Sequence, residues 1–338
     1  MYDLAFPLLI GLIITALAFD FLNGLHDAAN SIATVVSTRL LKPVHAVIFA
    51  GVCNFAAYFL TIAFPSLHAV ASTIGQGLID KNLITPGVVF GALVGAITWN
   101  LVTWLYGIPS SSSHALIGGL AGAAIAKGGT GTLVAAGFTK TAVAIVLSPA
   151  LGFLLGAVLV VITAWIGFHK NARRVERWFN RLQYVSAALY SLGHGSNDAQ
   201  KTMGIIWLLL IVSHSVSVDA ELPLWVVLAC QTAMGLGTLF GGWRIVKTMG
   251  MRITKLKPVG GFCASASGAA TLFLATSLGV PVSTTHTITG AIVGVGSARS
   301  VSAVRWGVAG NIVWAWIFTI PASAFVAAVA YWISLNVF

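Results

Sequence analysis

Two aspartates of the sequence stand inside long apolar stretches. Asp27 belongs to the cluster Asn23-Gly24-Leu25-His26-Asp27-Ala28, and Asp198 belongs to His194-Gly195-Ser196-Asn197-Asp198-Ala199. An ionisable side chain inside an apolar membrane segment is costly to bury and marks a functional site by default. A carboxylate there can hold a cation, carry a proton, or accept a hydrogen bond from a protonated substrate oxygen. We therefore predict that Asp27 and Asp198 handle a coupling ion or proton. The alternative for Asp198 is a structural pair with Lys201, three residues further along the same helical face.

Two further clusters combine proline with hydroxyl side chains. They read Ile108-Pro109-Ser110-Ser111-Ser112-Ser113-His114 and Val280-Pro281-Val282-Ser283-Thr284-Thr285-His286. Each precedes an apolar run, so its hydroxyls and backbone N–H groups would lie at the positive end of a helix dipole. Such a pair of tips suits a tetrahedral oxyanion, although helix caps and small-residue helix contacts are the structural alternative. The predicted substrate-binding hydroxyls are those of Ser111, Ser112, Ser113, Ser283, Thr284 and Thr285.

The same clusters contain amides and imidazoles. Amide groups offer an oxygen to a hard cation and N–H donors to an anion; we assign Asn30 and Asn197 to the substrate and Asn23 to the coupling ion. Asp20 lies one turn before the first cluster and is expected to contact the binding residues rather than the ligand. Imidazoles can shuttle protons or donate to an anion, or serve only as hydrogen-bonding helix contacts. The candidate coupling imidazoles are those of His26, His114, His194 and His286.

Buried carboxylates also bear on which anion is bound. A phosphate ion carries a proton near neutral pH, whereas sulfate would set one buried acceptor against another. Phosphate is therefore favoured, a sulfate permease is the alternative, and competition by sulfate would separate them. A passive anion channel is a further alternative, but a channel needs no coupling group on its path. An enzyme is disfavoured: a hydrolase built from a tip's Ser and His would have no acid beside either His, and HExxH is absent.

Composition indicates which elements position these groups. Of the 338 residues 58% are hydrophobic and only 8% charged, against about 25% charged in a typical soluble domain. We expect an all-α polytopic membrane protein, with apolar residues enough for about nine or ten spans of roughly 20 residues. No stretch alternates like a barrel strand. The net charge is +10, and the basic residues stand in short runs between apolar stretches. This pattern indicates a protein that lies in a lipid bilayer and does not bind nucleic acid.

The chain also contains an internal repeat. The two aspartates are offset by 171 residues, and Pro109 with Pro281, Gly118 with Gly290 and Pro149 with Pro321 are each offset by 172. We divide the chain into a first transmembrane repeat (1–168), a basic cytoplasmic linker (169–182) and a second transmembrane repeat (183–338). Polar and Gly/Pro-rich clusters cannot face lipid. All four clusters are therefore interpreted as interruptions, which gives broken helices and re-entrant helical hairpins.

Charge predicts the orientation, because cytoplasmic loops near helix ends carry excess Lys and Arg. The linker contains five basic residues and one acid, Glu176, so we place it in the cytoplasm. The segment Arg244 to Lys257 then also falls inside, while its counterpart Ser66 to Thr85 and both termini fall outside. The repeats are therefore inverted, as in secondary transporters that alternate access around a central site. The other residues placed outside include Asp3, Asp80, Lys81, Lys127, Lys140, Asp219 and Glu221.

At these residues the sequence resembles the inorganic phosphate transporter (PiT) family. Its duplicated signature is similar to Gly24 to Asn30 and to His194 to Lys201, the tips match as well, and the resemblance covers almost the whole chain. It implies a secondary active transporter that imports inorganic phosphate across the cytoplasmic (inner) membrane by ion-coupled symport. Lys201, which closes the second pattern, joins the predicted substrate-binding residues.

One residue narrows this resemblance. His26, where Asn is commoner, resembles the bacterial low-affinity PitA branch, which implies a proton rather than sodium as coupling cation and phosphate carried with a divalent metal. The resemblance indicates no cofactor, and we assign no metal ligands. The oligomeric state is left open, with a homodimer as one candidate.

Overall fold

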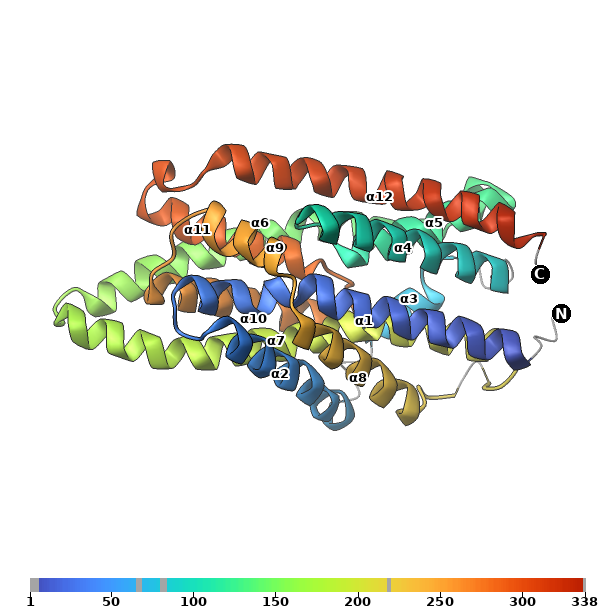
Figure 1. The fold of residues 1–338 in the computed structure, drawn as a ribbon, viewed down its shortest axis with the longest axis horizontal. Coiled ribbons are helices and arrows are strands. Elements are labelled where there is room, and N and C mark those ends of the chain that lie inside the picture. Colours follow the sequence, from blue (N-terminus) through green and yellow to red (C-terminus); the bar gives the residue numbers. More distant parts are fainter. Residues whose placement is uncertain (1–5, 65–68, 80–83, 218–219, 337–338) are drawn as a thin grey trace.

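The computed structural model describes residues 6–64, 69–79, 84–217 and 220–336. This part of the chain is a bundle of long helices without a named β-strand (Figure 1). Among the predicted outside residues, Asp3, Asp80, Lys81 and Asp219 lie outside the described residues. The helices are α1 (Phe6–Ser37), α2 (Pro43–Ala63), α3 (Ala69–Gln76), α4 (Pro86–Tyr106), α5 (Ser112–Gly128), α6 (Ala135–Gly167), α7 (Ala172–Val212), α8 (Leu224–Phe240), α9 (Trp243–Lys247), α10 (Pro258–Ser277), α11 (Thr284–Arg299) and α12 (Trp306–Ser334).

Six of these helices are long and apolar enough to cross a membrane: α1, α2, α4, α6, α10 and α12. A seventh span is possible if α8 is joined to the segment that follows it at a bend of 64°. The chain is thus an all-α, multi-pass membrane protein. The estimate of nine or ten spans exceeds these six or seven candidates among the described residues, in part because the short apolar helices α5 and α11 are mostly buried in protein. An apolar count does not distinguish a helix that faces lipid from one that faces other helices.

Several helix starts follow from local sequence. Pro43, Pro86 and Pro258 occupy the first turn of α2, α4 and α10, where the missing N–H is not needed and the fixed φ favours a helix. Gly107 ends α4 in the left-handed region at φ 67°, which glycine adopts at low cost. The chain can therefore turn sharply from α4 into the tip that begins α5.

The helices repeat along the chain with the same offset as the motifs. α4 and α10 begin 172 residues apart, as do α5 and α11, and Pro149 in α6 corresponds to Pro321 in α12. α6 runs toward the end of the molecule where it turns into α7, whereas α12 runs back to the end where α1 begins (Figure 1). These two corresponding helices therefore run in opposite directions. Superposition of the halves by a two-fold rotation stays a prediction.

The two halves of the sequence are interlocked. α6 packs on α11 of the other half, and α12 packs on α4 and α5. A Cβ at Gly290 would lie 2.2 Å from the carbonyl oxygen of Pro149, and one at Gly118 would lie 2.7 Å from that of Ile320. Because both contacts are with backbone, these positions require glycine. Each short helix that begins at a tip is thus held by the last helix of the opposite half.

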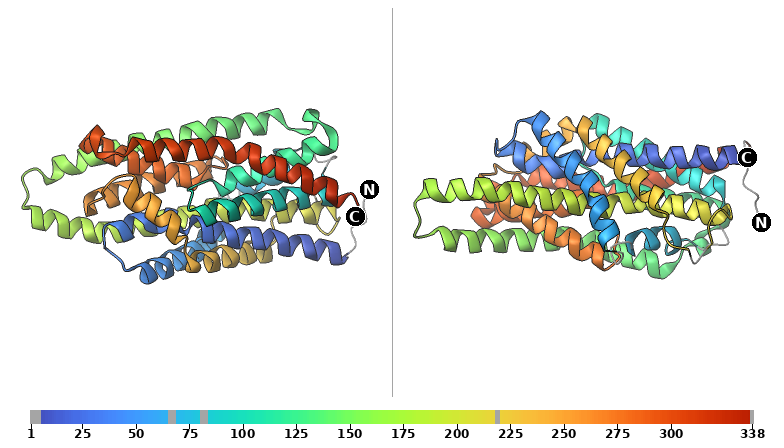
Figure 2. Two further views of the ribbon diagram at one scale, coloured as in Figure 1. Left: turned by 45° about the horizontal axis from the view of Figure 1, so that its top comes forward. Right: turned by 90° about the horizontal axis from the view of Figure 1, so that it is seen from below.

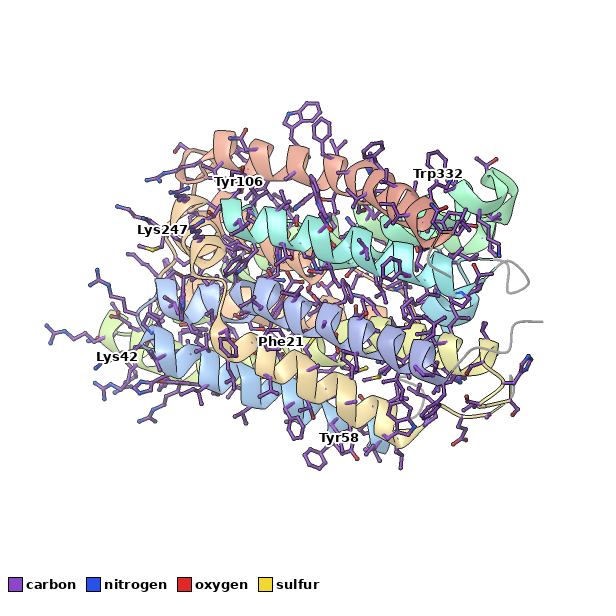
Figure 3. All side chains as sticks on the ribbon, turned by 45° about the vertical axis from the view of Figure 1, so that its right-hand side comes forward. Phe21, Lys42, Tyr58, Tyr106, Lys247 and Trp332 are labelled. Carbon is purple, nitrogen blue, oxygen red and sulfur yellow. The ribbon has the colours of Figure 1, made fainter. Side chains whose placement is uncertain are left out.

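The predicted linker is mostly helical. α7 begins at Ala172, and the side chain of Asn171 caps it by accepting a hydrogen bond from the N–H of Arg173 at 2.9 Å. The α6–α7 hairpin projects beyond the other helices at one end (Figure 2). Lys42 and Lys247 lie toward the same end, far from Trp332 (Figure 3). Basic residues therefore gather at the end opposite to the start of α1.

Two of the four predicted interruptions are wrong. α1 is continuous through Asn23 to Asn30, and α7 is continuous through His194 to Lys201. The glycines of these motifs serve close helix approach instead, since a Cβ at Gly24 would lie 2.2 Å from the carbonyl oxygen of Met234. Neighbouring helices also supply hydrogen-bond partners to much of the polar cluster, so the helices need not break to bury it.

Candidate functional site

The two hydroxyl-rich tips cap helices that begin inside the protein. The Oγ of Ser111 accepts a hydrogen bond from the N–H of His114 at 3.2 Å, and Ser283 does the same for His286 at 3.1 Å. The Oγ of Ser113 donates to the carbonyl oxygen of Val282 at 3.2 Å. Two helix N-termini from opposite halves therefore meet, each with a positive dipole end.

Lys201 connects the second aspartate to both tips. Its ammonium donates to Asp198, to the Oγ of Ser113 at 2.5 Å and to the carbonyl oxygen of Val282 at 2.9 Å. Thr284 donates to the other carboxylate oxygen of Asp198 at 3.0 Å. The ion pair suggested by their spacing is therefore present. Because the same ammonium contacts both tips, the pair belongs to the site that the tips form. We call this group of tip residues, aspartates and their contacts the phosphate cluster.

Asp27 of α1 contacts the tip of α11. Its carboxylate lies 2.7 Å from Nδ1 of His26, and Thr285 donates to it at 3.4 Å. The other imidazole nitrogen of His26 lies 3.0 Å from Oγ1 of Thr103 and 3.4 Å from Oγ of Ser110. Adjacent threonines on the α11 tip thus contact the two aspartates separately.

A candidate cation position lies between α1 and α7. Ligand atoms of Asp27, His194 and Asp198 all fall within 4.8 Å of one another. Nε2 of His194 is 3.3 Å from Asp198, and its Nδ1 is 3.2 Å from the side-chain oxygen of Asn54. Two carboxylates and an imidazole suit a divalent metal or protons, and carboxylate oxygens also suit sodium.

The predicted amides divide between the cluster and its surroundings. Asn30 donates to the hydroxyls of Thr284 at 3.2 Å and Thr285 at 2.9 Å, and so lies in the cluster. Asn197 instead donates to Thr276 of α10 at 2.9 Å, and the Asn23 amide lies 4.0 Å from the sulfur of Met234 in α8. Their side-chain oxygens have no hydrogen-bond partner within the described part of the chain.

Comparison with known proteins decides the family. Residues 23–327 match the sequence profile of the phosphate transporter family. The chain belongs to this family. A "Probable low-affinity inorganic phosphate transporter" of Rhizobium meliloti is 62% identical over 328 residues, which cover 97% of both chains. A Bacillus subtilis protein of the same description is 47% identical over 338 residues, covering 99% of this chain and 100% of the relative.

A solved structure supports the same assignment. The structure described as "The sodium-dependent phosphate transporter" aligns with a TM-score of 0.85 at 25% identity, covering 98% of this chain and all of that one. The family resemblance of the motifs is therefore confirmed. This chain is a phosphate transporter by family, and the relatives reported above are all described as transporters.

In this transporter, the histidines of the two tips lie in a ring stack. The rings of His114 and His286 meet edge to face with centroids 4.4 Å apart, and His286 stacks on Trp316 at 3.7 Å. Trp316 also donates to the carbonyl oxygen of Pro109 at 3.1 Å. The stack joins both tips to α12, whereas His26 and His194 are the imidazoles beside the aspartates.

Sequence reasoning missed several members of the cluster. Thr103 and Asn54 hold the two aspartate-bound histidines, and the hydroxyl of Tyr190 donates to the carbonyl oxygen of Thr284 at 3.0 Å. Ser110 lies within a tip and was identifiable there. Thr103, Asn54 and Tyr190 stand in ordinary apolar helix segments, so nothing local distinguishes them.

Asp20 lies in α1 about two turns before Asp27. It is fully buried, and neither carboxylate oxygen has a hydrogen-bond partner among the described residues. A carboxylate buried without a salt bridge is costly, and protonation removes that cost.

Proposed function

We propose that this protein imports inorganic phosphate across the cytoplasmic membrane by proton-coupled symport, with both termini outside. One observation carries the proposal: two buried carboxylates on α1 and α7 contact the N-terminal tip of α11, beside the tip of α5. Groups suited to an anion thus lie next to groups suited to protons or cations. Substrate and coupling charge would compensate each other in one low-dielectric site.

The anion would bind between the two tips. Their helix dipoles and hydroxyls suit a tetrahedral oxyanion, and Lys201 adds the cluster's ammonium group. The Oγ of Ser112 is buried and has no hydrogen-bond partner in the described structure, so it can donate to a ligand without losing a protein contact. The predicted substrate ligands remain Ser111, Ser112, Ser113, Ser283, Thr284, Thr285, Asn30, Asn197 and Lys201.

Phosphate is the proposed substrate because of the two carboxylates. The proton of HPO4 or H2PO4 can be donated to Asp27 or Asp198, whereas sulfate offers no such donor near neutral pH. A sulfate permease remains the alternative within the same arrangement. Sulfate in excess should therefore leave phosphate uptake almost unchanged.

Proton coupling is supported by the partners of the carboxylates. Asp27 faces His26, Asp198 faces His194 and Lys201, and the buried Asp20 forms no salt bridge within the described residues. Protonation of these groups would offset the negative charge of an entering phosphate. Sodium, or a divalent metal carried with phosphate, would occupy the position between Asp27, His194 and Asp198.

Transport also needs a change of conformation. Asp27 is 2% exposed, Asp198 is fully buried and Ser113 is 3% exposed, so water does not reach the cluster in this structure. We propose alternating access, in which the tips of α5 and α11 open the cluster first to one side and then to the other.

Uptake of radiolabelled phosphate into proteoliposomes tests the proposal. An inwardly directed proton gradient should drive accumulation above equilibrium, and a protonophore should abolish it. Accumulation driven by a sodium gradient alone would overturn proton coupling. Equilibration without accumulation under either gradient would instead indicate a passive channel. Removal of divalent cations with EDTA tests whether phosphate crosses as a metal complex.

A further inference from the structure

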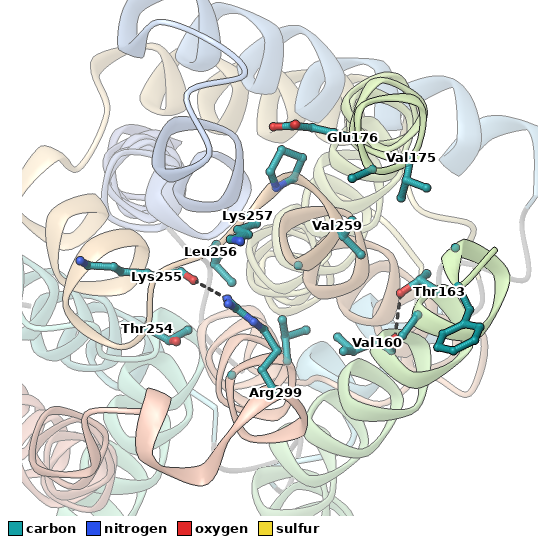
Figure 4. A pocket seen from close by; sticks show the side chains of 18 of the residues that line it. Val160, Thr163, Val175, Glu176, Thr254, Lys255, Leu256, Lys257, Val259 and Arg299 are labelled. Carbon is teal, nitrogen blue, oxygen red and sulfur yellow. Dashed lines mark hydrogen bonds between the residues drawn. The ribbon is translucent and has the colours of Figure 1, made fainter. Parts of the chain in front are cut away.

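A cavity lies among α6, α7, α10 and α11, at the end of α11 opposite its tip (Figure 4). It encloses about 600 Å³. Its walls are apolar: Val160 and Ala164 come from α6, Val175 from α7, Val259 from α10 and Val295 from α11. None of the residues that form the phosphate cluster lines it. A ligand of this cavity would therefore be separate from the transported phosphate and would have an apolar part.

The mouth of this cavity is basic. Lys170, Lys255, Lys257 and Arg299 line it, against one acid, Glu176. All five are exposed, and none forms a salt bridge among the described residues. Arg299 donates to the carbonyl oxygen of Lys255 at 3.2 Å, which holds its guanidinium beside the lysines. The mouth thus presents an excess of positive charge to an incoming group.

The cavity also borders the lipid-facing surface. α6 is apolar along its length and little of it is buried inside the protein. Trp165 is 85% exposed and Phe168, at the edge of the cavity, is 80% exposed. Exposed aromatic residues at the end of a span mark the membrane–water interface. An acyl chain could therefore enter beside α6 while its headgroup stays at the basic mouth.

We propose that this cavity binds one anionic phospholipid. The headgroup phosphate contacts Lys255, Lys257 and Arg299, and an acyl chain lies along Val160 and Ala164. Basic pockets between helices recognise anionic headgroups, and the apolar depth distinguishes a lipid from a free anion. A zwitterionic lipid brings a cationic group to a mouth that is already positive.

The site would act on transport through α11. Val295, Gly296 and Arg299 at the end of α11 line the cavity, while Thr284 and Thr285 at its start contact the aspartates. A lipid seated there holds the far end of the helix whose tip must move. This inference does not depend on which ion drives phosphate uptake.

Thermal unfolding of the purified, delipidated protein tests lipid binding. Short-chain phosphatidylglycerol should raise the Tm in a saturable manner, whereas phosphatidylcholine of the same chains and glycerol 3-phosphate should not. The double variant Lys255→Gln/Lys257→Gln should weaken the apparent affinity roughly thirtyfold, at about 1 kcal/mol per lysine. The matched control is Lys42→Gln/Lys247→Gln, which removes two exposed lysines from the same end but outside the cavity.

A second variant separates the acyl chain from the headgroup. Ala164→Trp fills the cavity and leaves its charges intact, so it should abolish the Tm shift by phosphatidylglycerol while the lipid-free Tm stays near that of the wild type. An equal shift with glycerol 3-phosphate would mean a free-anion site, and an equal shift with phosphatidylcholine a nonspecific crevice. Either result, or an equal loss in the lysine control, overturns the proposal.

Discussion

The tips of α5 and α11 arise from the same repeated pattern but have different neighbours. Both begin with a capping serine, and the rings of His114 and His286 pack together. The α11 tip contacts both aspartates through Thr284 and Thr285, whereas Ser113 of the α5 tip contacts the ammonium of Lys201. Duplication thus supplies the same tip twice, but one copy contacts carboxylates and the other contacts an ammonium group.

The aspartates differ in the same way. The ammonium of Lys201 forms an ion pair with Asp198, whereas the carboxylate of Asp27 contacts the imidazole of His26 and pairs with no lysine or arginine among the described residues. We infer that Asp27 with His26 exchanges the coupling proton and that Asp198 with Lys201 organises the anion site. The predictions below test this division of roles.

The largest effect is expected from Asp27→Asn and Asp198→Asn. Each change keeps the shape of the side chain but removes its charge and proton exchange, so phosphate accumulation in proteoliposomes should be abolished. The amount of protein in the membrane should stay near normal, because a neutral amide is easier to bury than a carboxylate. Wild-type accumulation by both variants would contradict the coupling role and favour a gated pore.

Lys201→Gln should lower the stability of the protein through its effect on Asp198. It leaves the carboxylate of Asp198 buried without its counter-charge, a change that typically costs about 3–5 kcal/mol. We expect a clearly lower Tm and lost uptake. Adding Asp198→Asn should restore the Tm but not the uptake, which a purely structural ion pair would not predict.

His26→Asn tests the other half of the comparison. It replaces the imidazole beside Asp27 with an amide that can still form hydrogen bonds, so phosphate exchange down its own gradient should persist. The ratio of uptake with and without an inward proton gradient should fall severalfold. An unchanged ratio, with normal protein levels, would remove His26 from the proton path.

The smallest effects are expected from single hydroxyls. Ser112→Ala removes a donor that has no protein partner and should raise the KM for phosphate by roughly tenfold or more, at about 1.5–3 kcal/mol for a bond to a charged group. Ser111→Ala removes a helix cap as well as a predicted phosphate donor, so it should also cost about 1 kcal/mol of stability. Equal changes in KM and Tm for both variants would show that the hydroxyls have no separate roles.

Much of the architecture was predictable because it depends on local chemistry. Apolar runs of spanning length indicate membrane helices, and the prolines and capping serines of the tips mark the starts of α5 and α11. The convergence of the two tips also follows the repeat. The breaks predicted in α1 and α7 were wrong. A local polar pattern with glycines occurs both where a helix breaks and where a continuous helix packs closely against a neighbour, so the sequence does not distinguish the two.

The sequence by itself determined the membrane class, the duplication and the identities of the polar groups, since these depend on composition and spacing. Only the tertiary structure decided which groups meet. Lys201 of α7 contacts Ser113 of one tip and the carbonyl oxygen of Val282 of the other, and Thr103 reaches His26 because α4 packs against α1. The separate contacts of Thr284 and Thr285 with the two aspartates likewise require helices from both halves. Such partners are tens to hundreds of residues apart, so no local pattern records them.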